Sequence, residues 1–316
     1  MEVDAETISR RTIDRLKGIL KSCTLCPRKC LVDRTRGELG FCRLADDVAV
    51  SHALPHYGEE PPISGTRGAG TIFLSSCNLK CIYCQNYQLS HNISGERTDV
   101  ERLCGIMLAL EKENCHNIEP VTPTPQIPQV IEALIIARQR DLRLPLVYNC
   151  GGYENPEVLE ILEGMVDIYL PDFKYGMENV ALVLSGVKDY AVHAIPSIKE
   201  MMRQVGEELL MEEGVAKRGI LVRHLIIPGF ISNSLEVLGL IKKHMSLSVP
   251  LSIMSQYTPI PSLKNHPHLR KRVTREEYEL VINCALDMGF ETIFTQNVDD
   301  RALVPDFRKK VPFDWS

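Results

Sequence analysis

The residues GTIFLSSCNLKCIYCQN, numbers 70–86, contain the pattern that decides the fold. The run GTIFLS at 70–75 is short and apolar, and it predicts a buried strand. Three cysteines, Cys77, Cys81 and Cys84, follow it with the spacing C-x3-C-x2-C. In parallel β/α folds, sites form at the carboxyl ends of the strands. The loop that contains these cysteines therefore lies where a binding or catalytic site is expected.

Similar apolar runs recur along the chain. They predict further strands at 117–122, 145–150, 166–173, 220–227, 250–257 and 291–295. Apolar residues at helical spacing lie between them and predict helices at 99–113, 127–135, 156–163, 196–212, 233–245 and 274–288. Two of these helices have recognisable starts, at Asn155-Pro156 and at Thr274.

The alternation of strands and helices predicts an α/β fold, with a mostly parallel sheet and helices outside it. A closed eight-unit barrel typically needs about 250 residues. Residues 70–295 supply only six units and a candidate seventh strand. We therefore expect an open, partial (β/α)6 barrel in a domain over residues 70–316, preceded by an extension over residues 1–69.

The composition excludes several classes of protein. The chain has 316 residues, of which 44% are hydrophobic and 24% charged, so we expect a packed globular core and not disorder. The formal net charge of −5 argues against a protein whose main partner is nucleic acid. No run reaches the length of a membrane span, and the acidic start MEVDAETISR lacks an apolar core. We expect a cytoplasmic protein with reduced thiols and no membrane partner.

The eleven cysteines are not scattered evenly. A second group lies in the extension, at Cys23, Cys26, Cys30 and Cys42. Four thiolates complete a closed metal site, so this group favours a possible second metal, either zinc or an auxiliary iron–sulfur cluster. Four reduced cysteines without metal is the alternative. The isolated cysteines are most simply interpreted as small core residues, at 104, 115 and 284, with Cys150 at a strand end.

The number of cysteines in the loop at 77–84 is informative. Structural zinc sites and ordinary electron-transfer clusters use four protein ligands. A [4Fe–4S] cluster that is held by three thiolates leaves one iron open to a ligand that is not protein. A zinc loop, or three unlinked core cysteines, is the alternative interpretation.

The three-cysteine motif, with an aromatic residue before its last cysteine, resembles the signature of the radical S-adenosylmethionine (SAM) superfamily. The resemblance continues in VTPTPQIPQVIEAL, LPLVYN, VDIYLPDFKY, IKEMMRQVG, RGILVRHLIIPG and MSQYTP. Together these segments resemble the uncharacterised iron–sulfur proteins that are related to pyruvate formate-lyase activating enzymes. The resemblance implies a [4Fe–4S] cluster on Cys77, Cys81 and Cys84 whose open iron binds SAM. The reduced cluster then cleaves SAM to a 5′-deoxyadenosyl radical that abstracts hydrogen from a substrate.

The same resemblance implies roles for five further residues, listed here as candidate cofactor-binding residues: Tyr83, Asn149, Asp172, Lys174 and Arg223. Tyr83 would pack near the adenine, and Asp172 and Lys174 would lie near the carboxylate of the cofactor. Asp172 and Lys174 are two residues apart, so they face the same side of a strand, and a charged pair that points inward needs a reason. No residue beyond the cluster and the cofactor is expected to be catalytic. One feature departs from the pattern, because NIEPVTPT stands where many radical enzymes have Gly-Gly-Glu.

The resemblance predicts an oxidoreductase that abstracts hydrogen, and an activase of a glycyl radical enzyme is one form of it. Its expected partners are a substrate protein, peptide or small molecule, and a low-potential electron donor such as flavodoxin or ferredoxin. The alternative is a non-catalytic iron–sulfur or zinc protein that acts as a redox sensor or electron carrier.

Overall fold

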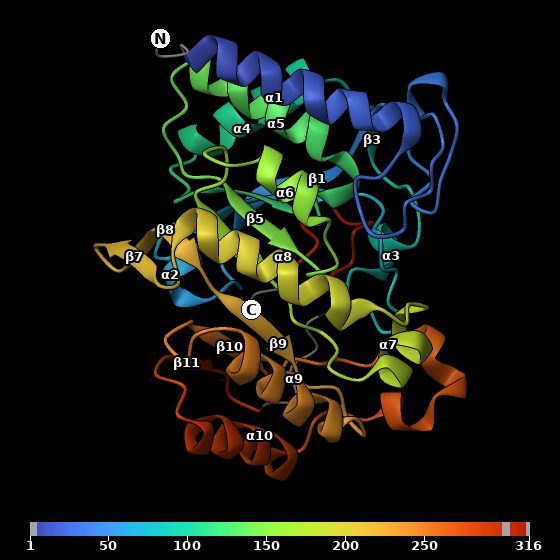
Figure 1. Cartoon of the computed structure of the whole chain (residues 1–316), viewed down its shortest axis with the longest axis vertical. Helices are drawn as coiled ribbons and strands as arrows, with labels where there is room; N and C mark the ends of the chain where they lie inside the picture. Colours follow the sequence, from blue (N-terminus) through green and yellow to red (C-terminus); the bar gives the residue numbers. More distant parts are fainter. Residues whose placement is uncertain (1–4, 299–303, 314–316) are drawn as a thin grey trace.

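Parallel strands with helices on their outer side form the main body of the protein (Figure 1). The structure is a computed structural model that describes residues 5–298 and 304–313. The larger sheet has the order β3-β1-β2-β4-β5-β6-β8-β7, and the smaller one has the order β11-β10-β9. In the larger sheet, β2, β4, β5, β6 and β8 run parallel to one another, and in the smaller sheet all three strands are parallel.

The strands fall where the sequence predicts them. The predicted series corresponds to β2 (Ala69–Leu74), β4 (Ile118–Val121), β5 (Val147–Cys150), β6 (Ile168–Pro171), β9 (Val222–Leu225), β10 (Leu251–Met254) and β11 (Ile293–Thr295). Every residue of β2, β5, β6 and β10 is buried, which explains their continuous apolar runs.

The two sheets are joined by β8 and β9, which follow each other almost directly in the chain. Only Leu221 separates β8 (Val215–Ile220) from β9, and the backbone of Asp172, directly after β6, bridges to Arg223 in β9. The strands therefore curve as one series from β2 to β11, which confirms the predicted partial (β/α)6 barrel with a seventh strand. This junction also brings the end of β6 against the middle of β9.

The helices cover the outer face of the strands (Figure 1). They are α4 (Val100–Lys112), α5 (Ile127–Gln139), α6 (Pro156–Ile161), α7 (Glu178–Ser185), α8 (Tyr190–Val205), α9 (Ile231–His244) and α10 (Arg275–Met288). Both predicted helix starts are confirmed. Asn155 Oδ1 accepts the amide N–H of Glu157 at 3.2 Å, and Thr274 and Glu277 form a reciprocal capping box.

The predicted helix at 196–212 is partly wrong. The helix α8 begins at Tyr190, continues past Pro196 and ends at Gly206, whose φ of 92° is the left-handed value that glycine adopts readily. Residues Leu209–Glu212 form β7, which pairs antiparallel with β8. The turn between them is Glu213-Gly214, with φ values of 52° and 79°, a two-residue hairpin turn.

The described residues of the extension, 5–69, pack directly on the barrel. The helix α1 (Ala5–Ile19) contacts α5 and α6, and the strand β1 (Val48–His56) pairs antiparallel with β2 and with β3 (Glu96–Thr98). The Gly- and Pro-rich run before β2 contains the short helix α2 (Pro61–Ser64). Whether residues 1–69 form a unit of their own stays a prediction.

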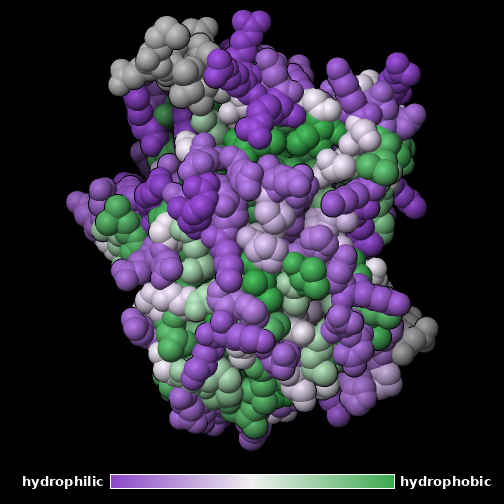
Figure 2. Space-filling view, viewed as in Figure 1, coloured by the Kyte–Doolittle hydropathy of each residue, from purple (hydrophilic) through white to green (hydrophobic). Residues whose placement is uncertain are grey.

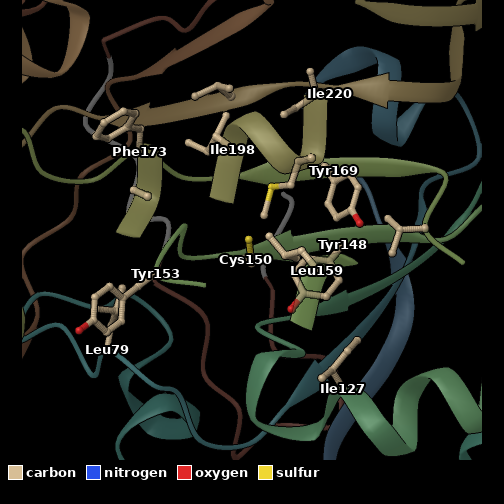
Figure 3. Packing of buried hydrophobic residues seen from close by; sticks show 14 of the residues in the cluster. Leu79, Ile127, Tyr148, Cys150, Tyr153, Leu159, Tyr169, Phe173, Ile198 and Ile220 are labelled. Atoms are coloured by element: carbon tan, nitrogen blue, oxygen red, sulfur yellow. The ribbon is translucent and has the colours of Figure 1, made fainter. Parts of the chain in front are cut away.

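One large cluster of buried apolar residues fills the space between strands and helices. It includes Cys150 at the end of β5, beside Tyr148 and Leu159 (Figure 3). Cys104 and Cys115 are also buried, as predicted, whereas Cys284 is half-buried. On the surface, hydrophilic side chains cover most of the face drawn in Figure 2. Among the described residues, no helix is both long enough and apolar enough to cross a membrane.

Candidate functional site

The loop with Cys77, Cys81 and Cys84 leaves the carboxyl end of β2 and leads into the short helix α3 (Tyr87–Ser90). Backbone bonds fix its shape: the amide N–H of Cys84 donates to the carbonyl of Cys81 at 3.1 Å, and that of Ile82 donates to Leu184 at 2.9 Å. The amide N–H of Leu79 donates to Cys77 Sγ at 3.3 Å. The loop is thus held from within and by the end of α7.

Cys81 is buried, Cys77 and Cys84 are partly buried, and the three thiols act on one another electrostatically. Burial raises the pKa of Cys77 and raises that of Cys84 to about 12, and the neighbouring Cys81 adds to both effects. The hydroxyl of Ser185 donates to Cys81 Sγ at 2.9 Å. Since burial opposes ionisation of an isolated thiol, these groups become thiolates when a cation or metal compensates their charge.

Cys77, Cys81 and Cys84 supply three thiol donors from one loop, and thiolates are the ligands of iron–sulfur clusters. Within the described part of the chain, no group of three His, Cys, Asp or Glu side chains is positioned to hold a single metal ion.

A network of charged side chains fills the barrel beside this loop. Arg223, on β9, donates from Nε to Asp172 Oδ1 at 3.0 Å, from Nη1 to Glu59 Oε2 at 2.9 Å and from Nη2 to Asn149 Oδ1 at 2.5 Å. The other oxygen of Asp172 accepts a bond of 2.5 Å from Lys174 Nζ. Four predicted cofactor-binding residues, Asn149, Asp172, Lys174 and Arg223, therefore meet where the carboxyl ends of β5 and β6 lie against β9.

Glu119 extends this network toward the first strands of the barrel. This residue of β4 accepts a bond of 2.8 Å from Asn149 Nδ2 and another of 2.8 Å from Thr71 Oγ1. Burial raises the pKa of Glu119, and the nearby Glu59 adds to the effect. Burial likewise raises the pKa of Glu59. Both carboxyls therefore hold a proton more readily than exposed ones.

The pKa of Asp172 is shifted in the opposite direction from those of Glu59 and Glu119. Burial acts to raise the pKa of this carboxyl, but the charges of Lys174 and Arg223 outweigh it, and the pKa lies below its ordinary value. Burial also acts to lower the pKa of Lys174, and Asp172 outweighs it, so that pKa is raised. Asp172 and Lys174 are therefore an ionised pair. The whole network combines three carboxyls with two cations, which suits a ligand with both positive and negative groups.

Lys174 connects the network to the cysteines. Its ammonium group acts electrostatically on Cys81 and Cys84, and on Cys77. Its amide N–H donates to the hydroxyl of Tyr190 at 2.8 Å, and that hydroxyl lies 2.7 Å from the carbonyl oxygen of Asp172. Lys174 is therefore bonded to the charged network and lies within electrostatic range of the three thiols.

Tyr83, the fifth predicted cofactor-binding residue, lies in the same region. It is buried, accepts a bond of 3.0 Å from the hydroxyl of Tyr175, and has its ring 6.2 Å from that of Tyr257. Burial raises the pKa of its hydroxyl, and the nearby Cys81 and Asp172 add to this effect. The structure thus places all five predicted residues around one site, with Tyr83 on the side of the cysteine loop.

The four cysteines of the extension lie next to this site. Cys23, Cys26, Cys30 and Cys42 all line one cavity. Arg28, between them in sequence, donates to the carbonyl of Asn78 at 2.9 Å, and the hydroxyl of Ser76 donates to the carbonyl of Cys42 at 2.5 Å. The two cysteine groups, distant in sequence, therefore contact each other through the loop after β2.

Comparison with known proteins identifies two uncharacterised relatives. No protein-family model matches the sequence. The uncharacterised protein MJ0674 of Methanocaldococcus jannaschii is 28% identical over 295 residues, which cover 89% of this chain and 79% of the relative. The uncharacterised protein MJ0808 of the same organism is 24% identical over 302 residues, with coverages of 87% and 81%.

Similar solved structures include two of SuiB from Streptococcus suis. One is bound to the precursor peptide SuiA and has a TM-score of 0.46 at 12% identity, covering 70% of this chain and 47% of that one. The other is bound to S-adenosylmethionine and has a TM-score of 0.46 at 13% identity, covering 70% and 48%. The present chain thus spans about half the length of these proteins.

Sequence reasoning missed several residues of the site, above all Glu59 and Glu119. Glu119 carries a signal, because a carboxyl inside the apolar run NIEPVT is unusual for a buried strand. Glu59 has none, since it lies in a Gly- and Pro-rich run that predicts only a loop. Thr124, in the stretch NIEPVTPT, donates to Glu154 Oε1 at 2.8 Å.

Proposed function

We propose that this protein is a radical SAM enzyme whose [4Fe–4S] cluster is held by Cys77, Cys81 and Cys84. The observation that supports this most strongly is that Lys174, which is bonded to Asp172 in the charged network, also acts electrostatically on the three thiols. A site that combines three thiolates with paired acidic and basic groups suits a cofactor that carries a sulfonium, an amino and a carboxylate group.

Different residues of the network would contact different groups of the cofactor. Lys174 and Arg223 would balance its carboxylate, while Asp172 and Glu119 would face its positive groups. Tyr83 would pack near its adenine. Each of these side chains is already held by hydrogen bonds within the barrel, so little would need to reorganise on binding.

When bound, the reduced cluster and SAM together supply an electron transfer to the sulfonium that releases a 5′-deoxyadenosyl radical. The contribution of the chain is to orient the cofactor and to exclude water around the thiols. Cys81 and Tyr83 are 6% and 4% exposed, so the interior is shielded from solvent on the side of the loop.

The substrate that we propose is a protein or peptide, with the activation of a glycyl radical enzyme as its specific form. The resemblance of the segments around residues 121–134 and 166–175 to activating enzymes supports this form. The electron that starts the reaction would come from a low-potential donor such as flavodoxin or ferredoxin.

The test of the cluster assignment is a spectroscopic one on the full chain after anaerobic reconstitution with iron and sulfide. Electron paramagnetic resonance of the dithionite-reduced protein should show a cluster signal that changes when SAM is added, because SAM binds the open iron. Cys81→Ala should lose that change, and Cys284→Ala, in α10, should retain it. A cluster signal that SAM does not alter would instead support the non-catalytic electron carrier, and a colourless zinc protein would overturn both.

A further inference from the structure

The four cysteines of the extension surround a cavity. Cys23 lies after α1, Cys26 and Cys30 follow in tight turns, and Cys42 comes from a separate turn after η2 (Arg34–Arg36). All four line one cavity of about 20 Å³, together with Arg34, Phe41 and Pro125, among others. Two chain segments thus converge on one space lined by sulfur.

A backbone donor points at one of these sulfurs, because the amide N–H of Phe41 donates to Cys30 Sγ at 3.4 Å. Burial raises the pKa of Cys26 and of Cys42, and the amides of Arg28 and Leu44 act against that rise. Hydrogen bonds to sulfur stabilise negative charge on it, and in iron–sulfur proteins they tune the cluster. These thiols would therefore ionise when a metal compensates their charge.

The guanidinium of Arg34 is buried beside these cysteines. Arg34 is 1% exposed, and it donates from Nη1 to the carbonyl of Pro125 at 2.7 Å and from Nη2 to that of Ala45 at 2.7 Å. Among the described residues no carboxylate pairs with it. Burial raises the pKa of Cys42, and the charge of Arg34 acts against that rise. Because a buried guanidinium without a counter-charge is costly, a negative centre at the cysteines explains why it is there.

The four thiols and the buried Arg34 together suit a negatively charged metal centre whose ligands all come from the protein.

We propose that Cys23, Cys26, Cys30 and Cys42 bind a second iron–sulfur cluster, closed by four thiolates and balanced in charge by Arg34. The segment that holds it contacts the first loop through Arg28 to Asn78, and through Lys80 Nζ to the carbonyl of Phe41 at 2.8 Å. The second cluster therefore lies beside the three-cysteine loop and supports its position.

The experiment isolates this site from the first one. The variant Cys77→Ser/Cys81→Ser/Cys84→Ser is reconstituted anaerobically with iron and sulfide, and its iron, zinc and acid-labile sulfide are measured. We expect iron and sulfide in equal amounts, about two or four of each per chain. One zinc per chain, one iron without sulfide, or no metal would overturn the proposal. The assay uses no SAM, so its result is independent of the proposed function.

Two further variants guard against a folding failure and test the charge. If the triple variant does not fold, Cys26→Ala/Cys42→Ala in the otherwise unchanged chain should lose the iron of one cluster and keep that of the other, and unchanged iron would contradict the proposal.

In the triple variant, Arg34→Gln should lower the reduction potential of the cluster, because a nearby positive charge favours the reduced form. Arg34→Lys should leave it close to the original, and equal potentials in all three proteins would refute the role of Arg34.

Discussion

Asp172 and Lys174 show how a spacing of two residues in the sequence becomes a functional pair. Both side chains point into the barrel from the end of β6, and they are bonded to each other at 2.5 Å. The sequence predicts this shared direction from strand geometry. It does not predict that Arg223 bonds to both Asp172 and Glu59, because these contacts join segments that are far apart in the chain.

Replacing the lysine tests its role in holding the cofactor. Lys174→Met should weaken SAM binding to the reconstituted protein by about tenfold or more, a loss of about 1.4 kcal/mol, because one of two cations is removed. The iron content should be unchanged. Equilibrium dialysis with labelled SAM measures the affinity, and Lys188→Met, at an exposed position after α7, is the control. Equal affinity in both variants would remove Lys174 from the cofactor site.

Glu154 gives the protein a pH-dependent stability. Burial raises the pKa of this carboxyl to about 8, although hydroxyls of Thr124 and Tyr148 donate to it at 2.8 and 3.1 Å. Between its ordinary pKa of 4.5 and about 8, the folded protein keeps a proton that the unfolded chain has released. The free energy of unfolding therefore falls as pH rises through this window and levels off above it.

Glu154→Gln should remove this dependence, because the amide has no proton to lose. At pH 5 the two proteins should have similar midpoints of thermal unfolding, whereas at pH 8 the variant should be more stable. The difference is of the order of a few kcal/mol, since one pKa unit corresponds to about 1.4 kcal/mol. Parallel curves for both proteins from pH 5 to pH 8 would show that Glu154 is ionised in the folded state.

At the scale of elements, the turn after β5 fixes the position of Asp172. Gly152 has a φ of 74°, and a Cβ added to it would lie 2.1 Å from the carbonyl oxygen of Asp172 and 2.7 Å from the hydroxyl of Tyr190. Only glycine permits this close approach of backbone to backbone. The turn therefore sets the distance between the ends of β5 and β6.

Gly152→Ala should destabilise the protein by several kcal/mol, because strain from the positive φ and a steric clash with backbone add together. The matched control is Gly164→Ala, which has a φ of 77° but no atom within 4 Å of the added Cβ. That variant should lose only about 1 kcal/mol. Urea denaturation measures both, and a similar loss in the two variants would show that the contact with Asp172 can relax.

The elements themselves were largely predictable. Strands that are buried on both faces have continuous apolar runs, and β2 and β6 show this clearly. The hairpin of β7 and β8 was missed because its apolar residues Leu209, Leu210 and Met211 also fit a helix. The deciding signal was the pair Glu213-Gly214, a turn of two residues that the helical periodicity obscured.

At the scale of the whole molecule, the alternation of strand and helix was sufficient to predict a partial barrel, but not how its two sheets join. That junction depends on the bridge between Asp172 and Arg223. The packing of residues 1–69 was equally beyond prediction, because β1 pairs with β2 across a Gly- and Pro-rich loop. Contacts between distant segments, such as Arg28 with Asn78, arise only once the chain has folded.

The central claim is that the loop after β2 and the charged network form one site for a cluster and SAM. The most direct test is the formation of 5′-deoxyadenosine by the full chain, reconstituted anaerobically and reduced with dithionite in the presence of SAM. We expect 5′-deoxyadenosine and methionine in equal amounts, with their formation abolished in Cys81→Ala and retained in Cys284→Ala. A reconstituted protein that contains a cluster on this loop but forms no 5′-deoxyadenosine would contradict it.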